Sequence, residues 1–274
     1  MNLNEQFQQH HIGLTVYSPD CTHSRLWGNL DYEIATMTGL TPVYRQWVNH
    51  DYNSIMRFYS GEAFEEKDPQ EAVWKYATVS PEIMQYGHLV TYMFITGPSL
   101  LTLWHGENAA EKLPQVKGST HPSEAAGNTI RGRFWCDNAV TNLMHVSDDE
   151  AEIQRELSAI GFNMDRDIIP LPLMQPEAHI IPKHSGIFTV YDVLKRQGAN
   201  LPDYTLPASG SAQETNQQLT AILKAASTPF TEAFFAGDMV TVTQLMQHLP
   251  VTPWERFVIQ CGTITRYKWN LEAL

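Results

Sequence analysis

The sequence contains few cysteines and no long apolar run. Its three cysteines, Cys21, Cys136 and Cys261, are widely spaced and odd in number, which fits reduced thiols better than a disulfide framework. We therefore expect a cytoplasmic protein. No run of apolar residues approaches the ~18 that a membrane-spanning helix needs, and the first residues show no apolar core of a secretory signal. Neither a membrane association nor secretion is expected.

Positive charge is also scarce. The chain has 18 Lys and Arg against 30 Asp and Glu, a net charge of −12. This balance disfavours nucleic acid as the main partner, because phosphate backbones need a basic surface. A nucleotide stays possible, since it needs only a few local cations. With 274 residues, the chain is long enough for two domains, or for one domain with a large extension.

In the first three-fifths of the chain, strand patterns alternate with helix patterns. Alternating or continuous apolar residues predict strands, and Asn or Asp followed by apolar residues at helical spacing predicts helices that end at Gly or Pro. The expected strands are 12–17, 42–48 and 100–104. The expected helices are 29–38, 51–59, 84–95 and 108–117, and residues 1–10 are expected to be frayed.

The last 112 residues, 163–274, have a different pattern. Four prolines between 170 and 182 predict a connecting arm, and residues 200–212 resemble a linker. Helices are expected at 190–197, around Leu219–Leu223, after Asp238, and after the Thr252-Pro253 pair. This part carries no catalytic signature. His179, His184 and His248 lack metal-ligand spacing with the cysteines, so no metal ligands are predicted.

One histidine stands at the end of a short apolar run. Asn142-Leu-Met leads into His145, and the following Ser147…Glu150 has the spacing of a capping box. A helix with apolar residues at helical spacing then ends near Gly161. On this helix Glu156 lies off the apolar stripe, where a carboxylate can hold one imidazole nitrogen and leave the other to attack. On pattern alone, a buried core histidine and a solvated glutamate are the favoured explanation of these residues.

The long polar loop before this histidine, Gly118–Arg133, is rich in Gly, Pro, Ser and Thr and carries two arginines. A polar loop with cations, next to a histidine at a strand end, is typical of a phosphate site with a nucleophile.

These motifs together resemble the nucleoside diphosphate kinase family. The family's N-x-x-H-G-S-D signature corresponds to Asn142-Leu-Met-His145-Val-Ser147-Asp148. Its loop pattern corresponds to Thr120-His-Pro122 and Asn128-Thr-Ile-Arg131-Gly132, and an upstream run to Gly97-Pro98 and Trp104-His-Gly-Glu-Asn108. The spacing agrees throughout with at most a one-residue slip, and the resemblance covers residues 11–162.

The resemblance implies an α/β (α+β) fold: a ferredoxin-like sandwich with a four-stranded antiparallel sheet. We therefore expect a kinase-like domain at 1–162 with an acidic insertion at about 60–82. A mostly helical C-terminal extension of unknown role is expected at 163–274. Family members form oligomers, so a homo-oligomer is possible here.

The resemblance also implies phosphoryl transfer from ATP or another nucleoside triphosphate to a nucleoside diphosphate, through a phosphohistidine at His145. Mg²⁺ would arrive with the nucleotide, bridging its phosphates. In the implied roles, Glu156 orients His145, Ser147 supports the pair, Thr120 and Arg131 bind phosphate, Asn142 binds the sugar, and Tyr59 lies near the phosphates.

Two positions depart from the family pattern. Ser18 stands where the family has a phosphate-binding lysine, and Pro114 stands where it has an arginine. Lys112 and Lys117 are near enough in sequence to substitute. One alternative is therefore a nucleotide-binding or scaffold module that keeps the fold without turnover. Another is a regulator that is phosphorylated on histidine and passes the phosphate to a protein.

Overall fold

The computed structural model describes residues 2–59, 89–206 and 212–269. The predicted insertion at 60–82, the start of the helix predicted at 84–95 and part of the 200–212 linker lie outside these residues. The chain forms two compact units from interleaved segments. Within the described residues, unit 1 holds 2–59, 91–118 and 143–180, and unit 2 holds 89–90, 119–142, 181–206 and 212–269. The domain boundary expected at residue 162 stays a prediction.

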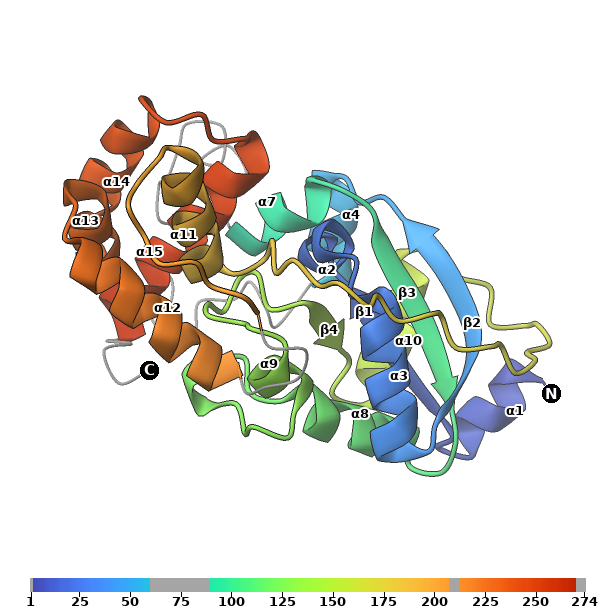
Figure 1. Cartoon of the computed structure of the whole chain (residues 1–274). Coiled ribbons are helices and arrows are strands. Elements are labelled where there is room, and N and C mark those ends of the chain that lie inside the picture. The colour runs from blue at the N-terminus through green and yellow to red at the C-terminus, as the bar shows by residue number, and fades with distance from the viewer. Residues whose placement is uncertain (1, 60–88, 207–211, 270–274) are drawn as a thin grey trace. The chain divides into compact units, whose positions relative to one another are not determined.

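Unit 1 is built on a four-stranded sheet. Its strands are β1 (Ile12–Tyr17), β2 (Thr41–Val48), β3 (Ser99–His105) and β4 (Met144–Val146), in the order β2-β3-β1-β4. Every neighbouring pair is antiparallel. The predicted four-stranded antiparallel sheet is therefore confirmed. β1 is buried along its whole length, because it has a strand on each side and helices above and below (Figure 1).

Helices cover both faces of this sheet. In Figure 1, α3 lies in front of the sheet and α10 behind it. α3 packs on α8, and α8 packs on β1. The helices of unit 1 are α1 (Leu3–Gln8), α2 (Pro19–Ser24), α3 (Trp27–Thr38), α4 (Tyr52–Phe58), α8 (Ala109–Lys117) and α10 (Glu150–Ala159). α7 (Leu89–Ile95) begins in unit 2 and continues into unit 1.

Two expectations for these helices were wrong. Residues 3–8 form α1 instead of a frayed end, because Leu3 and Phe7 are buried on one side of the helix. α3 begins at Trp27, not after an Asn29 cap. The Asn29 side chain instead bonds the backbone of Glu177.

That bond belongs to the proline-rich arm, residues 163–180, which runs along unit 1. Leu171 N donates to Pro42 O at 2.7 Å, and Arg45 Nη1 donates to Pro172 O at 2.8 Å. Arg45 also pairs with the buried Asp31. Burial raises the pKa of Asp31, against the opposing effects of its bonds from Tyr17 and Arg45. The arm itself is neither helix nor strand, so its backbone groups need partners elsewhere. Leu171 N and Pro172 O find these partners in β2.

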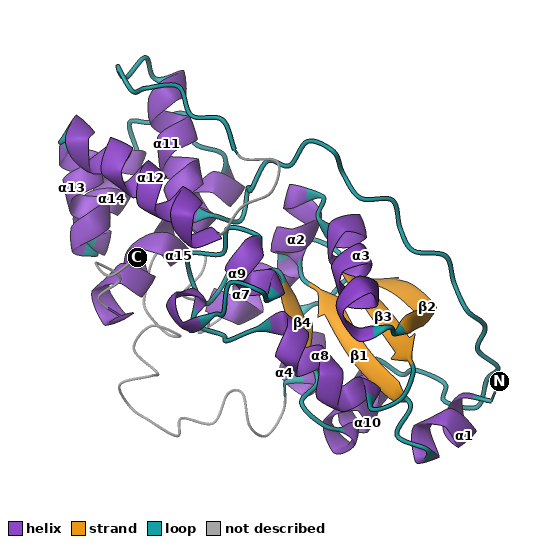
Figure 2. Ribbon diagram, turned by 60° about the horizontal axis from the view of Figure 1, so that its bottom comes forward, coloured by secondary structure: helices purple, strands orange, loops and turns teal. Residues whose placement is uncertain are grey.

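The C-terminal residues of unit 2 are mostly helical, as predicted. The helices α11, α12, α13, α14 and α15 lie together in Figure 2. They share a hydrophobic core that includes Val190, Leu219 and Phe234. Asp238 caps α14 and Thr252 caps α15, as expected. The elements are η1 (Pro122–Glu124), α9 (Ile130–Arg133), α11 (Gly186–Arg196), α12 (Ala212–Ala226), α13 (Pro229–Ala236), α14 (Met239–Met246) and α15 (Pro253–Trp269). Among the described helices, none has the length and apolar character to cross a membrane.

Candidate active site

His145 lies in the middle of β4, where it pairs with Val16 of β1. The chain reaches this strand through Leu143, whose φ of 78° is unusual for a residue with a side chain. Asp20 Oδ2 accepts a hydrogen bond from Leu143 N at 2.7 Å, and Asp20 is fully buried. The buried Asp20 carboxylate therefore stabilises the backbone turn at Leu143, which leads into the strand that carries His145.

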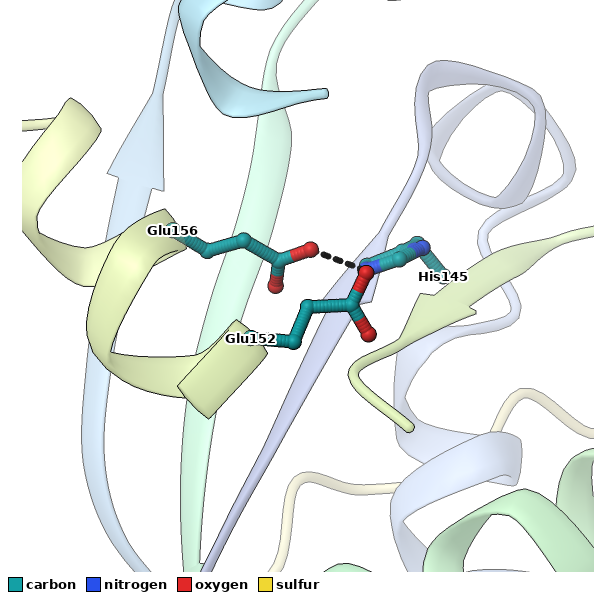
Figure 3. Close-up of side chains that lie close together, drawn as sticks. All are labelled: His145, Glu152 and Glu156. Atoms are coloured by element: carbon teal, nitrogen blue, oxygen red, sulfur yellow. Dashed lines mark hydrogen bonds and ion pairs between the residues drawn. The ribbon is translucent and has the colours of Figure 1, made fainter. Parts of the chain in front are cut away.

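His145 is bonded to Glu156 of α10. The His145 Nε2 to Glu156 Oε1 distance is 2.7 Å, and Glu156 Oε2 accepts a hydrogen bond from Ser147 Oγ at 2.6 Å. Glu156 is fully buried, whereas the His145 side chain keeps 15% of its surface. An ionised carboxylate only accepts hydrogen bonds, so the imidazole proton is on Nε2. The other nitrogen, Nδ1, then keeps its lone pair and points away from both carboxylates in Figure 3.

A second carboxylate and an arginine complete this cluster. Glu152 lies one turn before Glu156, and Arg155 Nη2 is 3.1 Å from Glu152 Oε1 and 3.6 Å from Glu156 Oε1. Burial raises the pKa of Glu152, and the charge of Glu156 adds to this effect. Neither Glu152 nor Arg155 was predicted for the site. The i, i+4 spacing of the two glutamates was the available signal, since such residues share a helix face.

One ligand atom each from His145, Glu152 and Glu156 lies within 4.8 Å of the others, close enough to hold a metal ion. The cluster fits Mg²⁺ poorly. Mg²⁺ prefers oxygen ligands and several waters, whereas here one donor is an imidazole nitrogen already bonded to Glu156. Arg155 also supplies a positive charge beside both carboxylates.

Two aromatic rings border the histidine. The rings of Phe58 and Tyr59, at the end of α4, meet the His145 ring edge-on at centroid distances of 5.6 and 5.2 Å. Arg155 Nη1 donates to Phe58 O, which ties the end of α4 to α10. The predicted site residue Tyr59 is therefore brought next to His145.

The predicted capping box at Ser147 was wrong. α10 is capped by Asp149, whose side chain accepts from Glu152 N at 2.8 Å. Ser147 is buried, and its hydroxyl donates to Glu156 instead. The helix thus starts two residues later than expected. This places both Glu152 and Glu156 on the side that faces His145 (Figure 3).

The positions that depart from the family pattern provide no cation. Ser18 is buried and donates to Asp20 Oδ1 at 2.5 Å, and Pro114 lies inside α8. Lys117, at the end of α8, has its Nζ 3.5 Å from Val146 O and 3.6 Å from an Asp148 carboxylate oxygen. Of the two lysines considered as substitutes, Lys117 is therefore the one placed against β4.

The other predicted residues lie together in unit 2. Arg131, on α9, is buried, and its Nε donates to Asn142 O at 3.1 Å. Its Nη1 is 3.5 Å from Thr120 Oγ1. Asn142 Nδ2 donates to Ala139 O at 2.9 Å and lies 3.5 Å from Thr120 O. Thr120, Arg131 and Asn142 therefore form one group within unit 2, and His145, Glu156, Ser147 and Tyr59 form another within unit 1.

Comparison with known proteins gives a consistent result. The profile of the nucleoside diphosphate kinase family matches residues 14–165, more than half of the chain. A nucleoside diphosphate kinase of Methylobacterium radiotolerans is 35% identical over 99 residues, which are 36% of this chain and 68% of that protein. The enzyme of Methylorubrum extorquens shows the same identity and coverage.

Solved structures of the same family are also similar. A Halobacterium salinarum nucleoside diphosphate kinase in complex with CDP is 22% identical with a TM-score of 0.45, covering 59% of this chain and 92% of its own. The enzyme of Encephalitozoon cuniculi is 18% identical with a TM-score of 0.42, covering 60% and 95%. The family profile and the sequence relatives show that this chain belongs to the nucleoside diphosphate kinase family, whose general activity is nucleotide phosphoryl transfer.

Proposed function

We propose that this protein transfers the γ-phosphoryl group of a nucleoside triphosphate to a nucleoside diphosphate through a phosphohistidine at His145. The observation that carries this proposal is the His145–Glu156 hydrogen bond of 2.7 Å, backed by the Ser147 hydroxyl. A histidine that only fills the core requires neither a buried carboxylate on one ring nitrogen nor an accessible second nitrogen. A nucleophilic histidine requires both.

In the first half-reaction, the Nδ1 lone pair of His145 attacks the γ-phosphorus. The Nδ1–P bond forms as the bond from phosphorus to the bridging oxygen breaks, and the nucleoside diphosphate leaves with the electron pair. The ring gains positive charge as Nδ1 is phosphorylated, and the Glu156 carboxylate stabilises this charge through Nε2–H. In the second half-reaction, the terminal oxygen of another diphosphate attacks the phosphorus and the imidazole leaves.

The nucleotide-binding roles follow the family resemblance. Arg131 and Thr120 would bind phosphate, Asn142 the sugar, and Tyr59 would lie near the phosphates. Mg²⁺ would enter as part of the nucleotide substrate and neutralise phosphate charge. No protein ligand for it is proposed. The cytoplasmic location and the homo-oligomer expected from the sequence stay predictions.

A second candidate is a nucleotide-binding module with little or no turnover. The buried Ser18, whose hydroxyl is bonded to Asp20, favours this reading. It brings no charge where the family places a lysine. The loss of one preorganised charge-stabilising group can cost roughly 10²–10³ in rate, and Pro114 marks a second loss.

Phosphoenzyme formation tests the two readings. The purified protein and its His145→Ala variant are mixed with γ-labelled ATP, and acid-labile, base-stable label on the protein is measured. We expect label on the wild type alone, discharged by an added nucleoside diphosphate. Bound ATP without label on the wild type would contradict the kinase and support the binding module.

A further inference from the structure

The segment 119–142 belongs to the same compact unit as the C-terminal helices. This segment carries Thr120, Arg131 and Asn142, yet its only described helices are η1 and α9, of three and four residues. Its polar residues Asp137, Asn138 and Thr141 are fully buried. Buried polar groups outside regular structure need partners from elsewhere, and several of these partners come from the extension.

Asp137 makes the main connection between this segment and the C-terminal extension. Its carboxylate accepts the backbone N–H groups of Gly186 at 3.0 Å and Ile187 at 2.7 Å, and the Ser185 hydroxyl at 3.0 Å. These groups are the N-terminus of α11, an 11-residue helix. A carboxylate is favoured there because the first N–H groups of a helix and the N-terminal end of the helix dipole both carry partial positive charge. Gly186 itself packs closely against Gly262 of α15. The start of α11 that binds Asp137 is therefore also packed against α15.

Further hydrogen bonds connect the extension to the same segment. Thr141 Oγ1 donates to His184 O at 2.6 Å, and the buried His184 Nε2 lies 2.6 Å from Phe134 O. Trp135 Nε1 donates to Thr215 Oγ1 of α12 at 3.1 Å. α12 also packs directly on α9, the helix that carries Arg131.

A short path leads from these bonds to the predicted phosphate group. Asn138 Nδ2 bonds both Asp137 Oδ1 and Thr141 Oγ1, at 2.9 and 2.6 Å. Asn138 Oδ1 accepts from Thr141 N at 2.7 Å. Thr141 precedes Asn142, whose carbonyl receives Arg131 Nε. Each step is a buried hydrogen bond or a peptide bond, so a continuous set of bonds connects the start of α11 to Arg131.

We propose that the C-terminal extension is a positioning device for nucleotide binding: Ser185 and the start of α11, acting through Asp137 and Thr141, set the geometry of Arg131, Asn142 and Thr120. The proposal rests on the proposed function for the identity of the ligand. It makes Asp137, Thr141 and Ser185 positioning residues, none of which touches substrate or the reacting atoms. It also gives residues 181–269 a role that the resemblance leaves open.

The test compares Thr141→Val with Thr263→Val in the full-length chain. Both threonines are fully buried. The Thr263 hydroxyl donates only within α15, to Ile259 O. We expect Thr141→Val to weaken equilibrium binding of ADP by about tenfold, because a small misplacement of a binding group has a large effect. Thr263→Val should leave ADP binding unchanged, and Thr141→Ser, which keeps the hydroxyl, should restore it.

A second pair of variants tests the bond between Ser185 and Asp137 by changing the residue in the extension. Ser185→Ala removes the cap of α11 and its bond to Asp137, whereas Thr228→Ala removes the cap of α13 only. We expect weaker ADP binding for Ser185→Ala alone, although both lose a similar cap. Equal ADP affinity in either matched pair, measured on variants with native circular dichroism, overturns the proposal. Binding needs no turnover, so a wild type without phosphohistidine would reject the proposed function and still leave this comparison decisive.

Discussion

Glu156 is the residue on which the proposed chemistry at His145 depends. Its two carboxylate oxygens accept from His145 and Ser147, and it is fully buried. Glu156→Gln keeps the shape but removes the negative charge opposite the ring. A hydrogen bond to a charged group contributes about 1.5–3 kcal/mol. We therefore expect phosphoenzyme formation to slow by about 10- to 100-fold, measured by rapid quench in a single turnover.

Glu152→Gln is the matched control for this variant. Glu152 lies on the same face of α10, but its carboxylate accepts hydrogen bonds from Arg155 and from Asp148 N, not from His145. Its rate should stay within about threefold of wild type, since no hydrogen bond to the ring is lost. Equal slowing of both variants would show that negative charge near the ring, and not the specific bond, is what matters.

Of the two lysines considered as substitutes for the missing cations, Lys117 is the one that we expect to offset Ser18 and Pro114. Its side chain keeps only 15% of its surface and lies against Val146 O. We expect Lys117→Gln to weaken ATP binding by about fivefold, the equivalent of ~1 kcal/mol for a partly exposed charge. Lys112→Gln, on the same helix, should change little. Fluorescence titration with an ATP analogue measures both, and equal effects would reject Lys117 as the substitute.

His50 gives unit 1 a pH-dependent stability. It is buried between the rings of Phe58 and Phe94, and burial lowers its pKa to about 4. The unfolded chain, with a pKa near 6.5, binds more protons between about pH 4 and 6.5. The free energy of unfolding therefore rises with pH across this window, and about 3 kcal/mol is lost as pH falls through it.

Urea unfolding at several pH values between 4.5 and 7 checks this prediction. His50→Gln should flatten the pH dependence of the unfolding free energy, because it removes the group that takes up the proton. Replacement of the exposed His248 by Gln serves as the control and should leave the slope as in the wild type. A His50→Gln slope equal to wild type would contradict the assignment.

At the scale of elements, the start of α10 determines where its glutamates point. The Asp149 side chain caps the helix at Glu152 N. Asp149→Ala should lower the free energy of unfolding by about 1 kcal/mol, whereas Asp149→Asn should have almost no effect, because Asn caps a helix equally well. Urea denaturation distinguishes the two. A loss of the same size in Asp149→Asn would point to the charge and not to the cap.

The elements of unit 1 were predictable where the apolar pattern is long and ends at clear stop signals. β1, β2 and β3, the Asp51 cap of α4 and the Gly39 end of α3 all follow from such patterns. Short elements were not. The side chain that caps α10 is Asp149 and not Ser147, because the Ser147 hydroxyl is drawn into the buried bond with Glu156. A local motif cannot show that a more distant partner competes for the same group.

At the scale of the whole molecule, the reactivity of the three cysteines measures whether each unit is folded. Cys21 belongs to unit 1, and Cys136 and Cys261 belong to unit 2. None of the three is in a disulfide, and each has 2% or less of its surface exposed. We expect almost no reaction with a thiol reagent under native conditions and three reactive thiols in denaturant, since reactivity needs access to the sulfur. Rapid native labelling would show that one unit opens readily, and mass mapping would identify which.

The C-terminal residues show the limit of sequence patterns at this scale. Their helical character was evident from periodicity and caps, and α14 and α15 start where Asp238 and Thr252 predict. α13 was missed, although Thr228 and Pro229 open it. Nothing in the pattern indicated that residues 184–187, just before and at the start of α11, would provide partners of Asp137 and Thr141.

The sequence by itself determined the family, since motif spacing is a local property of the chain. The resemblance to that family then implied the antiparallel sheet and the residues expected to carry the chemistry. Only the tertiary structure decided which partners those residues have. It placed Glu152 close to His145 and Arg155 close to Glu156, and it joined Ser18 to Asp20. It also put residues 119–142 in one compact unit with the C-terminal helices. The physical reason is that buried polar groups must be satisfied by whichever groups the fold brings near, however far apart they are in sequence.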